Sequence, residues 1–146
     1  MDPERLVFAE SRPVAEHLAR CRLADLFVDT FHYNAHTTAS DALWAGLPLI
    51  TMAGQGFATR VAASLLHAVG LDELITTTEE AYFDLSLELA RDPVKLAAIR
   101  AKLAANRLAL PLFDSERFTR HIEAGYEAAY QAYFEGRPPG DIRIDA

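Results

Sequence analysis

The stretch that decides the fold is residues 36–48, HTTASDALWAGLP, followed at once by the apolar segment 49–52, LITM. It predicts a polar helix start, one amphipathic helix, a glycine stop and a strand, because Gly46 can end a helix and Pro48 cannot continue one. The first turn carries His36, Thr37 and Thr38 and no acidic residue. Since the first N–H groups of a helix are free and lie at its positive end, this turn is suited to bind an anion such as phosphate.

Strands and helices alternate around this stretch. We expect about four short strands, at residues 6–8, 26–28, 49–52 and 74–75, with helices between them. Such alternation predicts an α/β fold with a parallel sheet, in which helix starts lie at the carboxyl ends of the strands, where open sheets bind nucleotides. So few strands fit a partial Rossmann-like sheet better than a complete one.

The second half of the chain is expected to be helical. Its helices are predicted at residues 79–91, 93–109 and 115–135, after helices at about 13–21, 37–45 and 57–69 in the first half. The last one carries an aromatic and aliphatic stripe at spacings of four, made of Phe118, Ile122, Tyr126 and Tyr130. A stripe of this kind, if left uncovered, predicts pairing with a second copy of the chain.

Composition limits the classes of function. The 146 residues, 51% of them hydrophobic, are enough for one core, and a net charge of −7 argues against binding nucleic acid. Cys21 is the single cysteine, which excludes an intrachain disulfide and fits a reducing compartment. No apolar run reaches the ~18 residues of a membrane span and the first residues lack signal-peptide character, so we expect a cytoplasmic protein without a membrane partner. His32, His67 and His121 show no metal-ligand spacing, and no metal is expected.

Six short motifs follow one another along the chain, each occurring once. They are EHLAR at 16–20, LADLFVDT at 23–30, HTT at 36–38 with Asp41, LWAG at 43–46, RVAAS at 60–64 and PLF at 111–113. In this order they resemble the O-linked N-acetylglucosamine transferase family with its SPINDLY-like relatives. The resemblance implies a GT-B glycosyltransferase, built from two facing Rossmann-like halves. Residues 1–113 would be part of the nucleotide-sugar-binding half, and residues 114–146 a long helix and tail of the same domain.

The resemblance also implies roles for single residues. His17 would lie over the uracil ring, Arg20 would reach the base, and Asp41 would accept hydrogen bonds from the ribose hydroxyls. His17 and Arg20 are three residues apart, which places them on one helix face, and planar imidazole and guanidinium groups stack on flat rings. From the residues alone, the favoured interpretations are a solvated helix face for His17 and Arg20 and, for Asp41, a first-turn acid that the helix dipole stabilises.

His36, Thr37 and Thr38 match the family's diphosphate-binding helix start, with an ordinary N-cap by Thr37 or Thr38 as the alternative. Where the family often has a lysine, three residues before the histidine, this chain has Val14, and Arg12 is the nearby residue that could replace it.

Asp25, Asp29, Trp44 and Arg60 are further polar or aromatic residues of these motifs. Asp29 is expected to have a structural turn role after its strand, and Asp25, before it, is also assigned to structure. Trp44 is expected to pack in the core. Arg60 is a secondary candidate for anion binding.

The function implied is inverting transfer of N-acetylglucosamine from UDP-GlcNAc to Ser or Thr hydroxyls of proteins. This chain would contribute the donor pocket, with no cofactor, no metal and no catalytic residue of its own, and would be inactive alone. Two alternatives stay open. One is a donor half that uses GDP-fucose, and the other is a non-catalytic nucleotide-binding or oligomerisation module.

Overall fold

The computed structural model describes residues 2–144 and contains a parallel sheet of three strands, β1 (Phe27–Val28), β2 (Leu49–Met52) and β3 (Ile75–Thr76). The strand order is β1-β2-β3, with Phe27 opposite Leu49 and Thr51 opposite Ile75. Each strand is followed by a helix, as the alternation of the sequence predicts. The α/β fold with a small parallel sheet is therefore confirmed.

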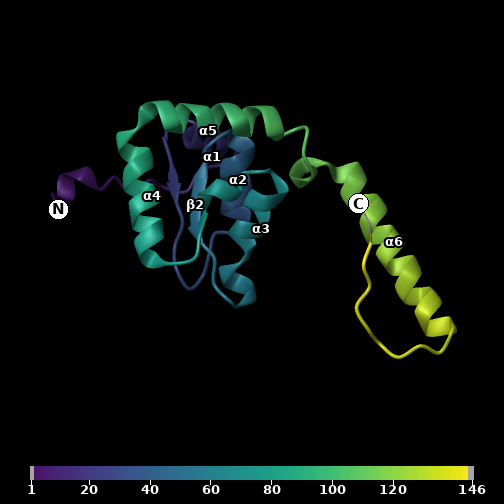
Figure 1. The fold of residues 1–146 in the computed structure, drawn as a ribbon. Helices are drawn as coiled ribbons and strands as arrows, with labels where there is room; N and C mark the ends of the chain where they lie inside the picture. Colours follow the sequence, from purple (N-terminus) through teal and green to yellow (C-terminus); the bar gives the residue numbers. More distant parts are fainter. Residues whose placement is uncertain (1, 145–146) are drawn as a thin grey trace.

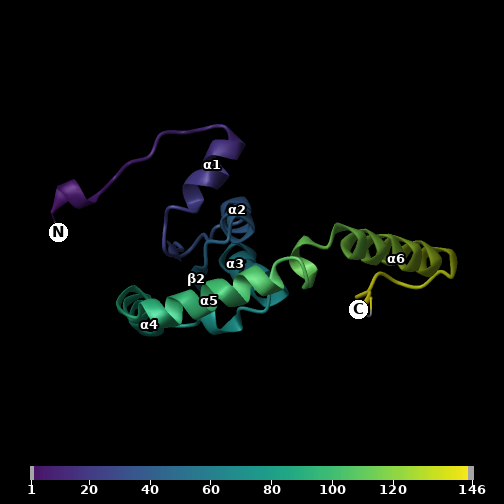
Figure 2. The same ribbon diagram turned by 90° about the horizontal axis from the view of Figure 1, so that it is seen from above.

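The helices lie on both sides of this sheet. They are α1 (Val14–Cys21), α2 (Thr37–Ala45), α3 (Val61–Ala68), α4 (Glu79–Arg91), α5 (Pro93–Asn106) and α6 (Ser115–Phe134). In Figure 1, α2 and α3 lie to one side of β2, α4 to the other, and α5 runs across one end of the sheet. Figure 2 shows α1 beyond α2, on which it packs.

Local signals set the ends of most helices. Gly46, at φ +87°, ends α2 in the left-handed conformation, and the N–H of Leu47 reaches back to the Ala42 carbonyl at 2.9 Å. The Thr78 hydroxyl caps α4, and the Asp92 carboxylate caps α5 directly before Pro93. The segment 57–69 departs from expectation, because it opens with a 3₁₀ turn, Phe57–Thr59, before α3 begins.

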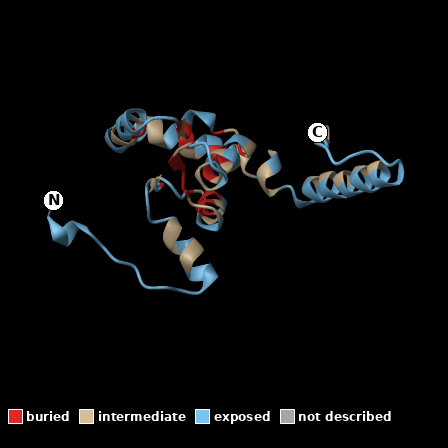
Figure 3. Ribbon diagram, turned by 90° about the horizontal axis from the view of Figure 1, so that it is seen from below, coloured by how far each residue is buried: buried red, intermediate tan, exposed pale blue. Residues whose placement is uncertain are grey.

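The core lies between the sheet and the inner faces of α2, α3, α4 and α5. Its fully buried members include Leu43, Leu49, Ile50, Leu66, Leu74, Leu89 and Leu103. Figure 3 shows the buried residues gathered around the sheet, whereas α6 is exposed or intermediate along its length. The chain thus buries its apolar residues in the α/β part and leaves the last helix outside.

The predicted strand at residues 6–8 is wrong. Leu6, Val7 and Phe8 form an irregular exposed segment, and the Phe8 side chain is 91% accessible to solvent. A strand needs a neighbour to pair its backbone groups, and among residues 2–144 the strand β1 pairs with β2 alone. The sheet therefore has three strands where about four were expected.

The prediction that Trp44 packs in the core is also wrong. Trp44 is 45% exposed, stacks edge-on against Phe113 at 5.1 Å, and lies under the Arg107 guanidinium at 5.5 Å. The inward face of α2 is occupied by Ala39 and Leu43. Trp44 follows Leu43 directly, and the turn of about 100° per helical residue carries it off that face.

The helix α6 extends away from the α/β part and has no buried residue. The tail after it turns back beside the helix, where the Ile144 side chain approaches Gly125. Phe118, Tyr126 and Tyr130 are each about two-thirds exposed, at 66%, 69% and 66%. Three of the four residues of the predicted apolar stripe are thus mostly exposed, and the fourth, Ile122, is 41% exposed.

Candidate functional site

Asp29 organises the carboxyl end of the sheet. Its buried carboxylate accepts hydrogen bonds from the N–H groups of Thr30 at 2.8 Å and Ala35 at 2.7 Å, and from the Thr51 hydroxyl at 2.6 Å. The first two bonds fold the loop between β1 and α2 back on itself, and the third ties this loop to β2. Asp29 therefore has the structural role that its position after a strand predicts.

The bonds of Asp29 continue across the sheet. The Thr76 hydroxyl donates to the Thr51 carbonyl at 3.0 Å, and the Tyr82 hydroxyl donates to the Asp29 carbonyl at 2.5 Å. Burial, with a smaller effect from the Asp29 charge, raises the pKa of Tyr82 to about 12. These contacts join all three strands and α4 at the carboxyl end of the sheet. They hold in place the residue at which the loop into α2 begins, Asp29.

The first turn of α2 has free N–H groups. The N–H groups of Ala39 and Ser40 both donate to the His36 carbonyl at 3.1 Å, whereas those of Thr37 and Thr38 donate to no residue within 2–144. Neither threonine hydroxyl caps the helix, since the N-cap residue is His36 and it forms no side-chain cap. The structure therefore differs from the ordinary threonine cap and leaves two exposed donors at the positive end of the helix.

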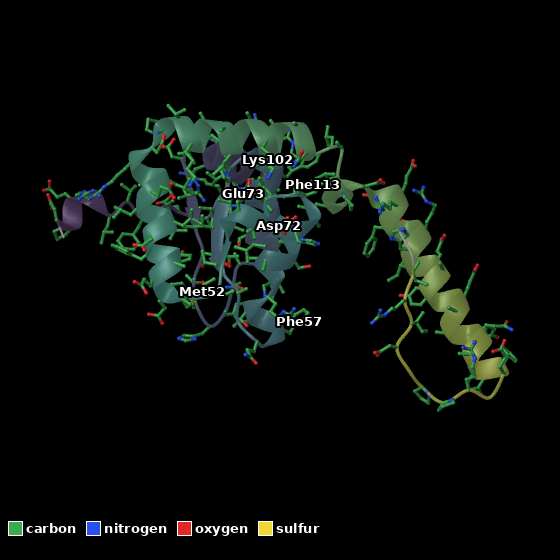
Figure 4. The ribbon with its side chains drawn as sticks, viewed as in Figure 1. Met52, Phe57, Asp72, Glu73, Lys102 and Phe113 are labelled. Carbon is green, nitrogen blue, oxygen red and sulfur yellow. The ribbon has the colours of Figure 1, made fainter. Side chains whose placement is uncertain are left out.

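A hollow of about 430 Å³ lies beside this turn, lined by residues 27–30 and 33–38. It is bounded by the end of β1, the β1–α2 loop and the first residues of α2. Figure 4 shows Met52, at the carboxyl end of β2, and Phe57 at the same end of the molecule, away from Glu73 and Lys102. The hollow thus lies where parallel α/β folds hold their ligands.

The His36 ring is held between two aromatic side chains. It stacks on Tyr33 at 4.9 Å with an interplanar angle of 18°, and it meets Phe57 edge-on at 6.0 Å. Its Nε2 atom is buried and has no hydrogen-bond partner in the described residues. The imidazole is therefore positioned by packing, with one polar atom left over for a ligand.

His17, Arg20 and Asp41 come together where α1 packs on α2. The Arg20 Nη2 donates to His17 Nδ1 at 3.2 Å, so that a neutral His17 ring carries its proton on Nε2. This Nε2 lies 3.9 Å from the Asp41 carboxylate and 3.8 Å from the Cys21 sulfur. The His17 and Asp41 side chains are both about one-third exposed, at 31% and 34%. The three predicted residues thus form one partly open cluster next to the α2 start.

Arg12 lies at the margin of this cluster. Its guanidinium pairs with the Glu10 carboxylate at 3.3 Å, while Arg20 donates to the Glu10 carbonyl at 2.8 Å. Arg12 is therefore linked to Arg20 through Glu10. Neither Arg12 nor the cluster of His17, Arg20 and Asp41 lines the hollow beside His36, which His36, Thr37 and Thr38 do line.

A second and larger hollow, of about 780 Å³, adjoins Phe57 on the side of α3. Arg60 and Ser64 line it together with Gln55. Arg60 is thus near a hollow, as its place as a secondary candidate suggests, whereas no sequence signal points to Phe57, which contacts His36 and also lines this hollow. Tyr33 and Asn34 line the smaller hollow, and their only sequence signal is a short loop rich in aromatic and polar residues.

Within residues 2–144, no three His, Cys, Asp or Glu side chains lie close enough together to hold a metal ion. Over the same range, every helix is too short or too polar to cross a lipid bilayer.

A parallel sheet with a polar helix start and an open hollow at its carboxyl end defines an α/β protein of the Rossmann-like class. Within that class, the chain belongs to glycosyl transferase family 41, which matches residues 1–122. Over 99% of its length it is 37% identical to the probable UDP-N-acetylglucosamine–peptide N-acetylglucosaminyltransferase SEC of Arabidopsis thaliana. It is also 37% identical to a probable transferase of the same kind, SPINDLY of Hordeum vulgare, over 89% of its length.

A solved structure supports the same assignment. An O-GlcNAc transferase variant of Thermobaculum terrenum matches 84% of this chain with a TM-score of 0.79 and 36% sequence identity. The matched region is 24% of that chain, and this chain spans 15% and 14% of the SEC and SPINDLY sequences. The fold is thus that of one part of a GT-B enzyme.

Proposed function

We propose that this chain is the donor-binding part of a protein O-GlcNAc transferase, which moves N-acetylglucosamine from UDP-GlcNAc to Ser or Thr hydroxyls of acceptor proteins with inversion. Membership of family 41 and the names of the relatives support the reaction and the substrates. The observation that carries the role of this chain is the open hollow at the α2 start, with the free N–H groups of Thr37 and Thr38.

In this proposal the donor diphosphate binds at the first turn of α2. The N–H groups and hydroxyls of Thr37 and Thr38 donate to its oxygens, and His36 Nε2 supplies a further contact. Negative charge develops on the leaving UDP during transfer, and fixed donors aimed at such charge are a large source of catalysis. Because the net charge of the chain is −7, an anion must be bound by local donors such as these and not by the overall charge.

The nucleoside is proposed to bind at the α1–α2 contact. His17 stacks on the base, Arg20 reaches its edge, and Asp41 accepts from the ribose hydroxyls. The 3.9 Å separation of His17 and Asp41 fits neighbouring base and ribose sites. Arg12, held near Arg20 through Glu10, is assigned to the outer edge of the base site.

The catalytic groups are assigned to the remainder of the parent enzyme, and neither a metal nor a cofactor enters the proposal. A glycosyltransferase must position donor and acceptor together, and this chain provides one side of the cleft. We therefore expect the isolated chain to bind UDP without transferring sugar. The cytoplasm stays the proposed location.

Calorimetric titration with UDP, UDP-GlcNAc and GDP tests the assignment. We expect UDP to bind, and we expect His36→Ala and Asp41→Ala each to weaken it by about tenfold, as the loss of a charged or phosphate contact does. Matched controls are His121→Ala and Asp84→Ala, which lie on α6 and α4 and should bind as wild type. A wild-type chain that binds no nucleotide would overturn the proposal, and tighter binding of GDP would favour a GDP-fucose donor.

The uncovered stripe on α6 favours a second role, as a surface for pairing two copies of the chain. This role is compatible with donor binding, because α6 extends away from α2, whose first residues line the hollow (Figure 1).

A further inference from the structure

Two of the residues that line the hollow each carry a buried polar atom without a hydrogen-bond partner in the described residues, and one of the two, Asn34, has no role so far. Asn34 is 1% exposed, and its backbone N–H donates to the Ala58 carbonyl at 2.9 Å. Its side-chain Nδ2 donates to the Thr30 carbonyl at 3.0 Å. Its Oδ1 is buried without a hydrogen-bond partner among residues 2–144, as is His36 Nε2.

The orientation of the Asn34 amide is set by its surroundings. Reversing it would place Oδ1 against the Thr30 carbonyl, where two acceptors would repel each other. The Oδ1 atom therefore stays on the free side of the amide, and a buried acceptor without a donor is costly. Only a group that donates a hydrogen bond can satisfy it.

We propose that Asn34 is a further substrate-positioning residue of this site, whose Oδ1 accepts a hydrogen bond from a hydroxyl of the donor sugar. The inference rests on the proposed function and adds to it. Phosphate oxygens only accept hydrogen bonds at neutral pH, so Oδ1 repels them, whereas the N–H groups of Thr37 and Thr38 attract them. The hollow is thus divided into a part for the diphosphate and a part for a hydroxyl-bearing group.

Access to these atoms requires a small movement. Both Asn34 Oδ1 and His36 Nε2 are shielded in the free protein. The rings that flank His36 are, however, mostly exposed, Tyr33 at 65% and Phe57 at 82%. Both rings therefore lie outside the core, and Tyr33 directly precedes Asn34 in the same loop. Under the proposal, this loop shifts when the donor binds, so that Asn34 Oδ1 meets the sugar.

The test compares UDP with UDP-GlcNAc, because the two ligands differ by the sugar. Both are titrated calorimetrically into wild type and Asn34→Ala. We expect the variant to bind UDP-GlcNAc about tenfold more weakly and UDP within about twofold of wild type. The matched control is Asn106→Ala, which also removes an amide that donates to one backbone carbonyl, that of Val69 at 3.0 Å, but far from the hollow. This control should bind both ligands as wild type.

UDP-GlcNAc analogues that each lack one sugar hydroxyl complete the experiment. One analogue should bind wild type about tenfold more weakly than UDP-GlcNAc and should bind Asn34→Ala as UDP-GlcNAc does. Equal losses for UDP and UDP-GlcNAc, or wild-type affinity for every analogue, would overturn the role of Asn34 while leaving UDP binding intact. Should Asn34→Ala not fold, Asn34→Leu, which also removes Oδ1 but fills the volume of the amide, takes its place in the same comparison. Failure of wild type to bind UDP would instead overturn the proposed function itself.

Discussion

At the scale of single residues, the carboxyl end of the sheet depends on a few buried polar contacts. The Asp29 carboxylate takes three hydrogen bonds, and its backbone carbonyl takes a fourth from Tyr82. Buried polar groups stabilise a fold when they are paired and destabilise it when they are not. We therefore expect the conformation of the loop that leads to His36 to depend on these four hydrogen bonds.

The contribution of Tyr82 to stability depends on pH. Its pKa is raised from 10.0 to about 12 in the folded protein, so folding favours the protonated phenol. The contribution is fully present below pH 10 and is lost as the pH rises from 10 to 12. We expect the thermal midpoint of the wild type to fall over this range more steeply than that of Tyr82→Phe. Parallel curves for the two proteins would contradict the assignment.

At the scale of elements, the unit α2–β2 could be predicted from sequence because its signals are local. Gly46 and Pro48 set the end of the helix whatever surrounds it. The two errors, the strand at 6–8 and the burial of Trp44, depend on which other segments lie alongside. Asn34 could not be found in this way, because an unpaired buried oxygen is a property of the assembled loop.

Gly46 gives a direct test of the α2 end. At φ +87° an alanine is strained, although its Cβ would have room, with Arg107 as the nearest neighbour at 3.8 Å. We expect Gly46→Ala to reduce the free energy of unfolding by about 1 kcal/mol, measured by urea denaturation. Gly140→Ala is the matched control, because nothing lies within 4 Å and its φ is not in the left-handed range. An equal effect of both changes would contradict a backbone origin.

At the scale of the whole molecule, an α/β part with a core is joined to a helix without one. The α/β part contains the buried leucines and both hollows, whereas α6 has no buried residue. The chain spans 15% of the length of the SEC relative. A continuous exposed apolar stripe such as the one on α6 is typical of an interface. It stays a prediction that residues 1–113 and residues 114–146 belong to the same domain.

A second copy of the chain is the partner available to the isolated protein in solution. We expect light scattering to show a dimer whose population rises with concentration, since pairing two stripes removes Phe118, Tyr126 and Tyr130 from water. Tyr126→Glu should shift the equilibrium to monomer, because a charge in the middle of the stripe would have to be buried. The control Gln131→Glu adds the same charge on another side of α6 and should leave the dimer unchanged. A wild type that stays monomeric at high concentration would contradict this pairing, and α6 would then have to be covered by another part of the parent enzyme.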